Sequence, residues 1–587
     1  MRFVSGQTPC SRVIAFVATL AATLSLSAWS VPALATPREL VQEVQELLGS
    51  QRANGRHFAM EFVPLEATER RASVSVAPNA PLIPASVTKL VTATAALEVL
   101  GPAYTFETRI YRTGPILDGV LEGDLSFEGN GDPFLVTERL WLLAHQLRSE
   151  GLQHVRGNLI VHASGFPLED PTAAESLGDT DRSYAARPSA VAANFNSLTL
   201  HVGPGDGPGA PAVISGDPYD LPYLEVDAAG IRTGAPGSRL DWSLTLESTP
   251  EGQRFEDWVS RIEAASSDST TVDPVFVLPE TALEVARVRG VIPVGIEPRT
   301  AYRRARYPLP MVASLLEAVL DEFEIEVEGT LQIDSRPPSG TPWTTFPSVS
   351  VADLIDNMNR YSSNFTANQL ALAVHRKWAA AKMTDLAEGD PTAGTVAGEG
   401  RPHGETSVPR STEGAASDLD TEAREAMVRL RLGDAGGSLT SWLSEADPDA
   451  AKGCRIFDGS GLSVDNRLTA HALTQLLVRT WDQLAYQSKL LASLPGPGEP
   501  GTLRSRFRGG RDEPVIFAKT GTLFDTIGLS GYTKGADGEL KIFSALVNNR
   551  PQSYSPLSTR QAVDGIVATV NGCWGPTKKT GEPPNVG

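Results

Sequence analysis

The period at which apolar residues recur changes several times along the chain. Residues 36–50 have a helical period, and residues 57–76 contain two short alternating runs that predict strands. A second helix is expected to open at Ser86, because Pro84 precedes it and the helical period then continues to Gly101. The N-terminal part therefore mixes helix and strand.

Beyond this helix the chain consists of short alternating runs broken by Gly, Pro, Asp and Asn, which predict a strand-rich segment. Helical periodicity returns at residues 310–323 and 351–379, and helices adjoin strands up to residue 570, so we expect an α+β fold. The expected parts are a leader at 1–35, a first part of the main domain at 36–104, an inserted strand-rich region at 105–299, a second part of the main domain at 300–574 with a mobile loop at 380–418, and a flexible tail at 575–587.

The apolar run from Val13 to Leu26 has the layout of a secretory signal peptide. Two arginines precede it, and the small residues Ala33 and Ala35 follow it. The run is shorter than the ~20 residues that a membrane-spanning helix needs. We therefore expect cleavage after Ala35 rather than a retained anchor, and an exported, periplasmic protein that is soluble or peripherally bound to the membrane.

Length, charge and cysteine content narrow the class of protein. A chain of 587 residues exceeds one ordinary core, and 41% hydrophobic with 21% charged residues is a globular composition. The net charge of -19 argues against a nucleic acid partner, because phosphate binding needs clustered cations. Cys10 lies in the expected leader, whereas Cys454 and Cys573 could form one disulfide or stay two thiols, and both readings remain open.

The segment from Ser86 to Lys89 carries a candidate nucleophile and its base. The hydroxyl and the amine stand three positions apart at a helix start, and so lie on the same face. A serine hydroxyl is a weak nucleophile until a base removes its proton, and a lysine can be that base only where its pKa is depressed from about 10.4. A lone Ser-x-x-Lys occurs often by chance on solvated helices, so this motif needs support from others.

A second candidate is the triplet Ser362-Ser363-Asn364 between two apolar helical segments. Such a triplet could simply cap the following helix. In the functional interpretation, Ser362 relays a proton to a leaving amine and Asn364 hydrogen-bonds the backbone of a peptide substrate.

A third candidate is Lys519-Thr520-Gly521 at the end of an apolar strand. A strand edge with this composition can bind an extended substrate whose terminal carboxylate faces Lys519 and Thr520. The same tripeptide recurs at Lys579 in the tail, where no strand flanks it, so we treat that copy as chance.

In this order, the three motifs resemble those of the penicillin-binding protein and serine β-lactamase superfamily. More narrowly the chain is similar to the D-alanyl-D-alanine carboxypeptidase and endopeptidase family, peptidase S13, the class C low-molecular-mass penicillin-binding proteins, over nearly the whole mature chain. That subgroup has a long insertion between its first and second motifs, and the spacing from Ser86 to Ser362 fits it. Further support comes from four stretches: Gly129–Pro133, Asn194–Leu198, Asp458–Ser463, and Ala518–Thr522 leading to Gly528–Tyr532.

The resemblance implies a transpeptidase-like domain, with an antiparallel sheet and flanking helices, that is interrupted by the insertion. It implies a serine D,D-peptidase that removes terminal D-alanine from stem pentapeptides of peptidoglycan, cleaves D-Ala-diaminopimelate cross-links, or both. Ser86 would form the acyl-enzyme, with Lys89 and Ser362 as further catalytic residues. Backbone N–H groups of Ser86 and Thr522 would form the oxyanion hole, and Asn364, Lys519, Thr520 and Gly521 would bind substrate. β-Lactams would acylate the same serine; no cofactor or metal is implied.

Two features depart from the family pattern. Ser363 stands where the family usually has Asp, and we expect this change to tune activity rather than abolish it. The stretch at 380–418 is longer than the family needs.

Other functions remain as alternatives. A Ser-His-Asp hydrolase is disfavoured because no Gly-x-Ser-x-Gly elbow occurs, and a zinc peptidase because no His-Glu-x-x-His pair is present. The insertion fits a cell-wall enzyme better than a hydrolytic β-lactamase. A catalytically silent peptidoglycan-binding scaffold or penicillin sensor is the alternative from another class. Oligomeric state and the balance of the two peptidase activities stay open.

Overall fold

The structure is a computed structural model that describes residues 57–65, 74–163, 165–168, 181–265, 272–388, 430–507, 515–535, 538–549 and 556–571. The expected leader, the expected helix at 36–50, the tail with its second Lys-Thr-Gly, and Cys573 lie outside these residues. No helix in the described ranges is both long and apolar enough to cross a membrane.

A five-stranded antiparallel sheet, in the order β19-β20-β21-β1-β2, organises the first group of elements. It brings an N-terminal strand beside a C-terminal one, because Met60 of β1 is the register partner of Ala545 of β21. All seven residues of β1 are buried, which shows that both faces of this strand are covered. The strands are β1 (Phe58–Pro64), β2 (Val74–Val76), β19 (Val515–Thr522), β20 (Ile527–Lys534) and β21 (Leu540–Val547).

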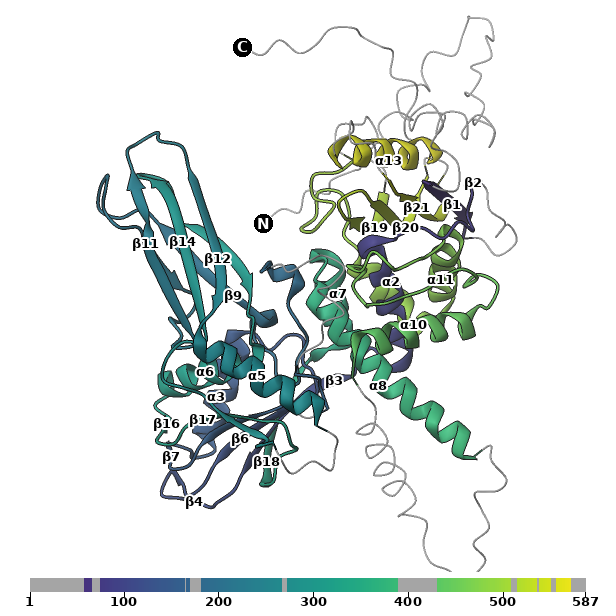
Figure 1. The fold of residues 1–587 in the computed structure, drawn as a ribbon. Helices are drawn as coiled ribbons and strands as arrows, with labels where there is room; N and C mark the ends of the chain where they lie inside the picture. Colours follow the sequence, from purple (N-terminus) through teal and green to yellow (C-terminus); the bar gives the residue numbers. More distant parts are fainter. Residues whose placement is uncertain are drawn as a thin grey trace, which may run out of the picture.

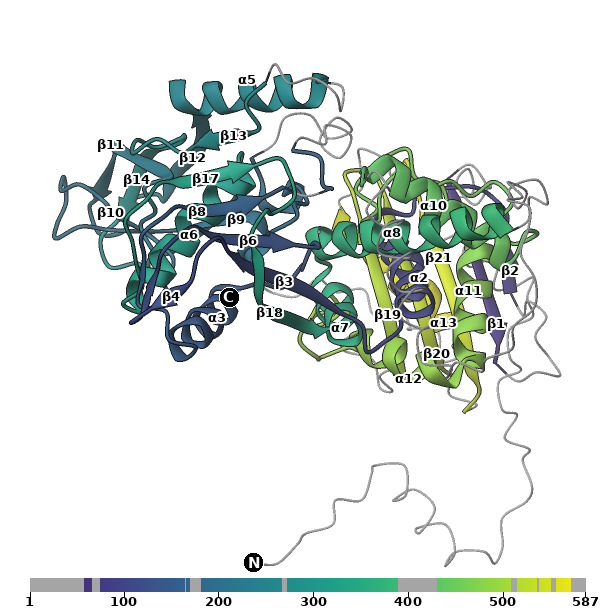
Figure 2. The same cartoon turned by 90° about the horizontal axis from the view of Figure 1, so that it is seen from below.

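Helices cover both faces of this sheet. Phe58 and Met60 pack in one cluster with Ile566 of α13, whereas Ala59 and Val63 point to the opposite face, into the cluster that holds the other helices. This alternation follows from the strand period of two, so the sheet is sandwiched between layers of helix (Figures 1 and 2). The helices are α2 (Lys89–Val99), α7 (Val351–Tyr361), α8 (Asn364–Glu388), α10 (Leu432–Ala446), α11 (Ala470–Asp482), α12 (Leu484–Ser493) and α13 (Pro556–Val570).

The second group of elements is strand-rich, as expected for the insertion. A six-stranded sheet in the order β13-β17-β8-β6-β3-β18 lies beside three smaller sheets. Its strands are β3 (Thr105–Arg112), β6 (Leu125–Gly129), β8 (Leu159–His162), β13 (Val275–Val277), β17 (Leu331–Asp334) and β18 (Thr341–Ser350). The smaller sheets contain β4 (Ile116–Leu117), β5 (Val120–Leu121), β7 (His154–Val155), β9 (Ser197–Gly203), β10 (Val213–Gly216), β11 (Leu224–Gly234), β12 (Asp241–Ser248), β14 (Glu284–Pro293), β15 (Arg299–Arg304) and β16 (Glu326–Val327).

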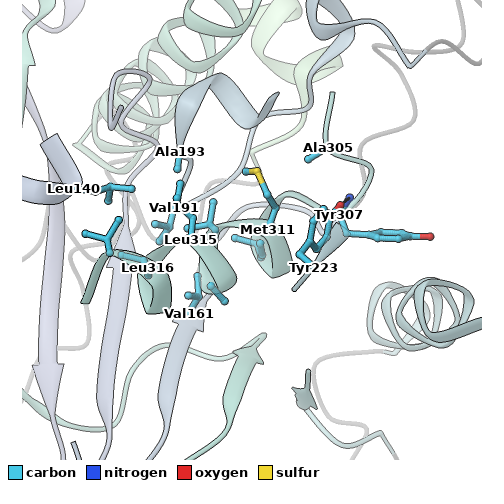
Figure 3. Packing of buried hydrophobic residues seen from close by; sticks show 14 of the residues in the cluster. Leu140, Val161, Val191, Ala193, Tyr223, Ala305, Tyr307, Met311, Leu315 and Leu316 are labelled. Atoms are coloured by element: carbon cyan, nitrogen blue, oxygen red, sulfur yellow. Dashed lines mark hydrogen bonds between the residues drawn. The ribbon is translucent and has the colours of Figure 1, made fainter. Parts of the chain in front are cut away.

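Three helices accompany these sheets: α3 (Thr137–Ser149), α5 (Pro250–Ala264) and α6 (Pro308–Glu322). We expected the chain to return to the main domain near residue 300, and for α6 this is wrong. Met311 and Leu315 of α6 are buried against Leu140 and Val161 of the second group, whose hydrophobic cluster extends from Ile110 to Phe346 (Figure 3). Helical periodicity shows that a face is buried but not against which partner.

The crossing between the two groups is made by two paired strands. The chain leaves the first group through β3 and returns through β18 directly into α7, and Thr105 is the register partner of Ser350. Figure 2 shows β3 and β18 side by side at this junction. The return therefore falls at Val351, which packs in the first cluster.

The mixed α and β class and its antiparallel sheet with flanking helices are confirmed. The expected loop at 380–418 begins later than expected, because α8 continues to Glu388. Ala380 is buried, and Lys382 pairs with Glu445 of α10 over 2.9 Å, so contacts with a neighbouring helix extend α8 beyond its apolar pattern. Residues 389–418 lie outside the described ranges.

Candidate active site

Ser86 lies in a short 3-10 turn, Ala85–Thr88, that leads into α2, whereas we expected an α-helix to begin at Ser86 itself. Ile83, two residues before this turn, is held at both backbone groups: its N–H donates to Asn548 Oδ1 over 2.7 Å, and its carbonyl accepts from Asn548 Nδ2 over 2.9 Å. Val87 and Thr88 are buried, and Ser86 is half-buried. The turn is thus anchored by Asn548, the residue that follows β21, while Ser86 is partly exposed.

Lys89 is completely buried, and its amine has three oxygen partners. Its Nζ lies 3.0 Å from Ser86 Oγ, 2.7 Å from Asn364 Oδ1 and 2.7 Å from the carbonyl of Ser460. Burial lowers the pKa of Lys89 to about 7, although the charge of Asp458 works in the opposite direction. A large fraction of this amine is therefore neutral at neutral pH and able to accept a proton from Ser86.

Lys519 and Ser362 form a second amine–hydroxyl pair. Lys519 Nζ donates to Ser362 Oγ over 2.9 Å and to the carbonyl of Thr520 over 2.9 Å. Lys519 is fully buried; burial, and then repulsion from Lys89, hold its pKa well below the usual value for lysine. Ser362 has a left-handed backbone, with φ of 61°, at the end of α7, and this conformation turns its side chain toward β19.

Asn364 and Ser363 open α8 and have different tasks. Asn364 bridges two parts of the chain, because its Oδ1 accepts from Lys89 while its Nδ2 donates to the carbonyl of Tyr184 over 3.0 Å. Tyr184 belongs to the 3-10 turn Ser183–Ala185 of the insertion. Ser363 Oγ accepts from the N–H of Thr366 over 3.2 Å, which is the geometry of a helix N-cap.

The loop from Asp458 to Ser463 contacts Lys89 through the carbonyl of Ser460. Asp458 Oδ1 accepts the backbone N–H groups of Ser460 and Gly461 over 2.8 and 2.6 Å, and Oδ2 accepts that of Ser463 over 2.6 Å. The loop is therefore wrapped around one carboxylate, and this wrapping aims the Ser460 carbonyl at Lys89. Gly461 has φ of +81°, and a Cβ there would lie 1.9 Å from the carbonyl oxygen of Ala85.

The third motif lies on β19, which is an edge strand of the five-stranded sheet. Gly521 faces the turn that carries Ser86, since a Cβ there would lie 2.7 Å from the carbonyl of Pro84. Leu523 and Thr526 exchange backbone hydrogen bonds, so the preceding pair, Thr522 and Ile527, is a non-hydrogen-bonded one. The N–H of Thr522 consequently points to the free edge of the sheet.

Five of the proposed site residues are thus linked by hydrogen bonds: Ser86, Lys89 and Asn364 in one chain of contacts, Ser362 and Lys519 in another. Thr520, Gly521 and Thr522 continue along β19 beside them. The repulsion between Lys89 and Lys519 shows that the two amines are close enough to affect each other. Cys454 carries a free, half-buried thiol and takes no part in the site.

Reasoning from the motifs did not identify the supporting residues. Asp458, Ser460 and Gly461 were noted only as part of a stretch that resembles a family. No local sequence pattern indicates the contacts made by Asn548 or by the Tyr184 carbonyl. One signal was present: an Asp followed by alternating Gly and Ser is typical of a loop whose N–H groups gather on a side chain.

A model of the D-Ala-D-Ala carboxypeptidase 3 (S13) family matches residues 41–244 and 435–570. The chain is 28% identical over 490 residues to a D-alanyl-D-alanine carboxypeptidase of Actinomadura sp. (strain R39), covering 82% of this chain and 76% of the relative. It is 23% identical over 488 residues to the D-alanyl-D-alanine carboxypeptidase DacB of Haemophilus influenzae, covering 82% of this chain and 83% of that one.

Among solved structures, penicillin binding protein 4 (dacB) of Haemophilus influenzae is similar, with a TM-score of 0.66 at 18% identity over 90% of this chain and 99% of that chain. At this identity the likeness concerns the fold, including the insertion that the alignment spans. Because the family model matches more than half of the residues, the chain belongs to the D-Ala-D-Ala carboxypeptidase 3 (S13) family.

Proposed function

We propose that the protein is a serine D,D-peptidase of peptidoglycan, acting outside the cytoplasm, in which Ser86 forms the acyl-enzyme. Family membership supports the reaction class. The observation that carries the assignment to Ser86 is the distance of 3.0 Å between its Oγ and the fully buried amine of Lys89, whose pKa is lowered to about 7. A serine placed against such an amine can be deprotonated as it attacks.

In the acylation step, neutral Lys89 accepts the proton of Ser86 as Oγ attacks the carbonyl of the penultimate D-alanine. The oxyanion that forms is stabilised by the N–H of Ser86 and by that of Thr522 at the free edge of β19, where one such donor is worth about 3 kcal/mol of barrier. The C–N bond then breaks, and Ser362, which contacts Lys519, passes the proton that Lys89 accepted to the departing amine, so that Lys89 is neutral again.

Substrate binding uses β19 and the start of α8. An extended stem peptide adds to the free edge of β19, with its carboxylate toward Lys519 and Thr520. Lys519 is then protonated, because a bound carboxylate favours the charged form that burial otherwise disfavours. Asn364 hydrogen-bonds the peptide backbone, and Gly521 allows β19 to approach the turn of Ser86. Water finally releases the acyl group, and β-lactams acylate the same oxygen.

The proposed reaction is removal of terminal D-alanine from stem pentapeptides, cleavage of D-Ala-diaminopimelate cross-links, or both. The test is intact-protein mass spectrometry after incubation with benzylpenicillin, together with a pentapeptide and a cross-linked dimer as substrates. Wild type should gain one adduct and release D-alanine; Ser86→Ala should do neither, whereas Ser149→Ala, which removes an exposed hydroxyl on α3, should behave as wild type. Folded wild-type protein without adduct or cleavage would leave only a binding role.

A further inference from the structure

Two adjoining clefts extend from the second motif across the insertion. The first has a volume of about 490 Å³ and is lined by Ser362, Asn364 and Phe365 on one side and by residues of α3, β9 and β15 on the other. The second, of about 280 Å³, lies between β9, β11 and α6. Both are lined by Asn194, Thr199 and Asp217, so together they form one groove that begins at the proposed active site.

The groove combines aromatic rings with neutral hydrogen-bonding groups. Tyr184 and Tyr302 are 51% and 57% exposed at the first cleft, and Trp141 and Phe195 also line it. Hydroxyl and amide side chains lie between them, among them Thr137, Ser183, Asn194, Ser197 and Thr199. Within the part of the chain that the structure describes, no lysine, arginine or histidine lines either cleft.

Several of these side chains are held in place without a ligand. The indole Nε1–H of Trp141 donates to Tyr219 Oη over 2.7 Å, and the Tyr219 hydroxyl donates to Glu322 of α6. Asn194 accepts the backbone N–H of Thr137 over 2.9 Å. A wall that is rigid before binding loses less conformational entropy when a ligand arrives, which favours specific recognition.

The charges of the groove exclude anionic ligands and disfavour ligands that are recognised through an ammonium group. Glu138, Asp217 and Asp220 line the groove and would repel an anionic ligand, and among the described residues no lysine, arginine or histidine of the lining compensates. All three carboxylates are exposed. Asp217 already faces His201 Nε2 over 3.2 Å, and Asp220 accepts the backbone N–H of Gly216 over 2.6 Å, so none of them forms a closed receptor for an ammonium group. A neutral ligand with apolar faces and many hydroxyl or amide groups fits the lining best.

We propose that this groove binds the glycan strand of the substrate, as a chain of neutral N-acetylated sugars, while the attached stem peptide occupies β19. The inference rests on the proposed function for the identity of the attached peptide. It assigns to the insertion a binding site for the polymer: sugar rings stack on Tyr302, Tyr184 and Trp141, and sugar hydroxyls bond to the polar side chains between them. The enzyme would then distinguish peptides on glycan from free peptides.

The first test compares kcat/KM for one pentapeptide attached to a peptidoglycan glycan oligosaccharide with kcat/KM for the same pentapeptide free. Wild type should favour the glycan-linked form by about tenfold, and Tyr302→Ala should bring the ratio close to one. Leu142→Ala is the matched control, because Leu142 is 59% exposed on α3 but lines neither cleft, and it should keep the wild-type ratio. A wild-type ratio near one, or an unaltered ratio in Tyr302→Ala, would overturn the proposal.

The second test measures binding in the absence of catalysis. Peptide-free glycan oligosaccharide is titrated by calorimetry into the Ser86→Ala variant. The same titration is then repeated with the double variant that carries Ser86→Ala and Tyr302→Ala. Binding by the first protein and at least fivefold weaker binding by the second supports the groove, even if wild type cleaves no peptide and the proposed function fails. Absence of binding, or tighter binding of a branched, glycan-free stem peptide, assigns the groove to a peptide and overturns the glycan.

Discussion

Lys89 Nζ lies 3.0 Å from Ser86 Oγ across a 3-10 turn, where the apolar pattern indicates an α-helix. Side chains three residues apart eclipse each other in a 3-10 turn, whereas in an α-helix they are offset around the axis. The turn is held by contacts from outside: Asn548 hydrogen-bonds both backbone groups of Ile83, two residues before the turn, and Gly461 lets the loop of Asp458 approach the Ala85 carbonyl. The serine–lysine geometry is therefore a product of tertiary packing.

The pH dependence of acylation should follow Lys89. Only the neutral amine can accept the proton of Ser86, and burial lowers its pKa to about 7. The rate constant for benzylpenicillin acylation should rise with pH to a plateau, with a midpoint near pH 7. Two pH units below that midpoint, the rate constant should be about 100-fold lower than at the plateau. Stopped-flow measurement between pH 5 and pH 9 gives the profile, and circular dichroism confirms folding at each pH. A rate independent of pH would contradict Lys89 as the base.

Asp458 should act on the same profile through its charge. Its carboxylate raises the pKa of Lys89, so Asp458→Asn should move the midpoint to lower pH. The amide would also present a donor to one of the N–H groups that the carboxylate accepts, and we expect a loss of about 1–3 kcal/mol in the free energy of unfolding. Asp465→Asn, at an exposed position of the same segment, is the control and should leave both quantities unchanged. An unshifted midpoint in folded Asp458→Asn would rule out this electrostatic role.

Gly461→Ala should impair the turn that carries Ser86. Its φ of +81° disfavours any side chain, and the new Cβ would lie 1.9 Å from the Ala85 carbonyl oxygen. We expect a loss of about 2 kcal/mol or more in unfolding free energy, together with slower acylation. Gly437→Ala is the matched control, since this exposed glycine of α10 has nothing within 4 Å and should gain about 0.5–1 kcal/mol. Urea unfolding and acylation kinetics measure both, and equal stability of the two variants would refute the contact.

Ser363 should matter for stability and little for chemistry. It caps α8 through the N–H of Thr366, and aspartate is an equally good cap, which explains how serine can replace the aspartate usual in the family. Ser363→Ala should lose about 1 kcal/mol in unfolding free energy, whereas Ser363→Asp should stay near wild type. Both should acylate within about threefold of wild type by mass spectrometry. A tenfold faster Ser363→Asp would show that the residue acts in the reaction.

The motifs predicted Ser86, Lys89, Ser362, Asn364 and Lys519 as site residues, because each carries a functional group that acyl transfer requires and each stands next to a recognisable element. The structure links these residues in two hydrogen-bonded groups, and their catalytic roles stay predictions. The second Lys-Thr-Gly, at Lys579, shows that spelling needed its strand context. Helix α6 shows the limit of periodicity, since its apolar face was visible but its partner was not, and the return to the first group was expected about fifty residues too early.

By itself the sequence determined the mixed α and β class, the order of the three motifs and the residues that bear reactive groups, since these follow from local patterns and side-chain chemistry. Only the tertiary structure decided that Lys89 and Lys519 are buried close together, that Asp458 and the Ser460 carbonyl brace one amine, and that the insertion reaches Asn364 through Tyr184. Burial and long-range hydrogen bonds set the pKa of a lysine, and both depend on residues that lie hundreds of positions apart in the chain.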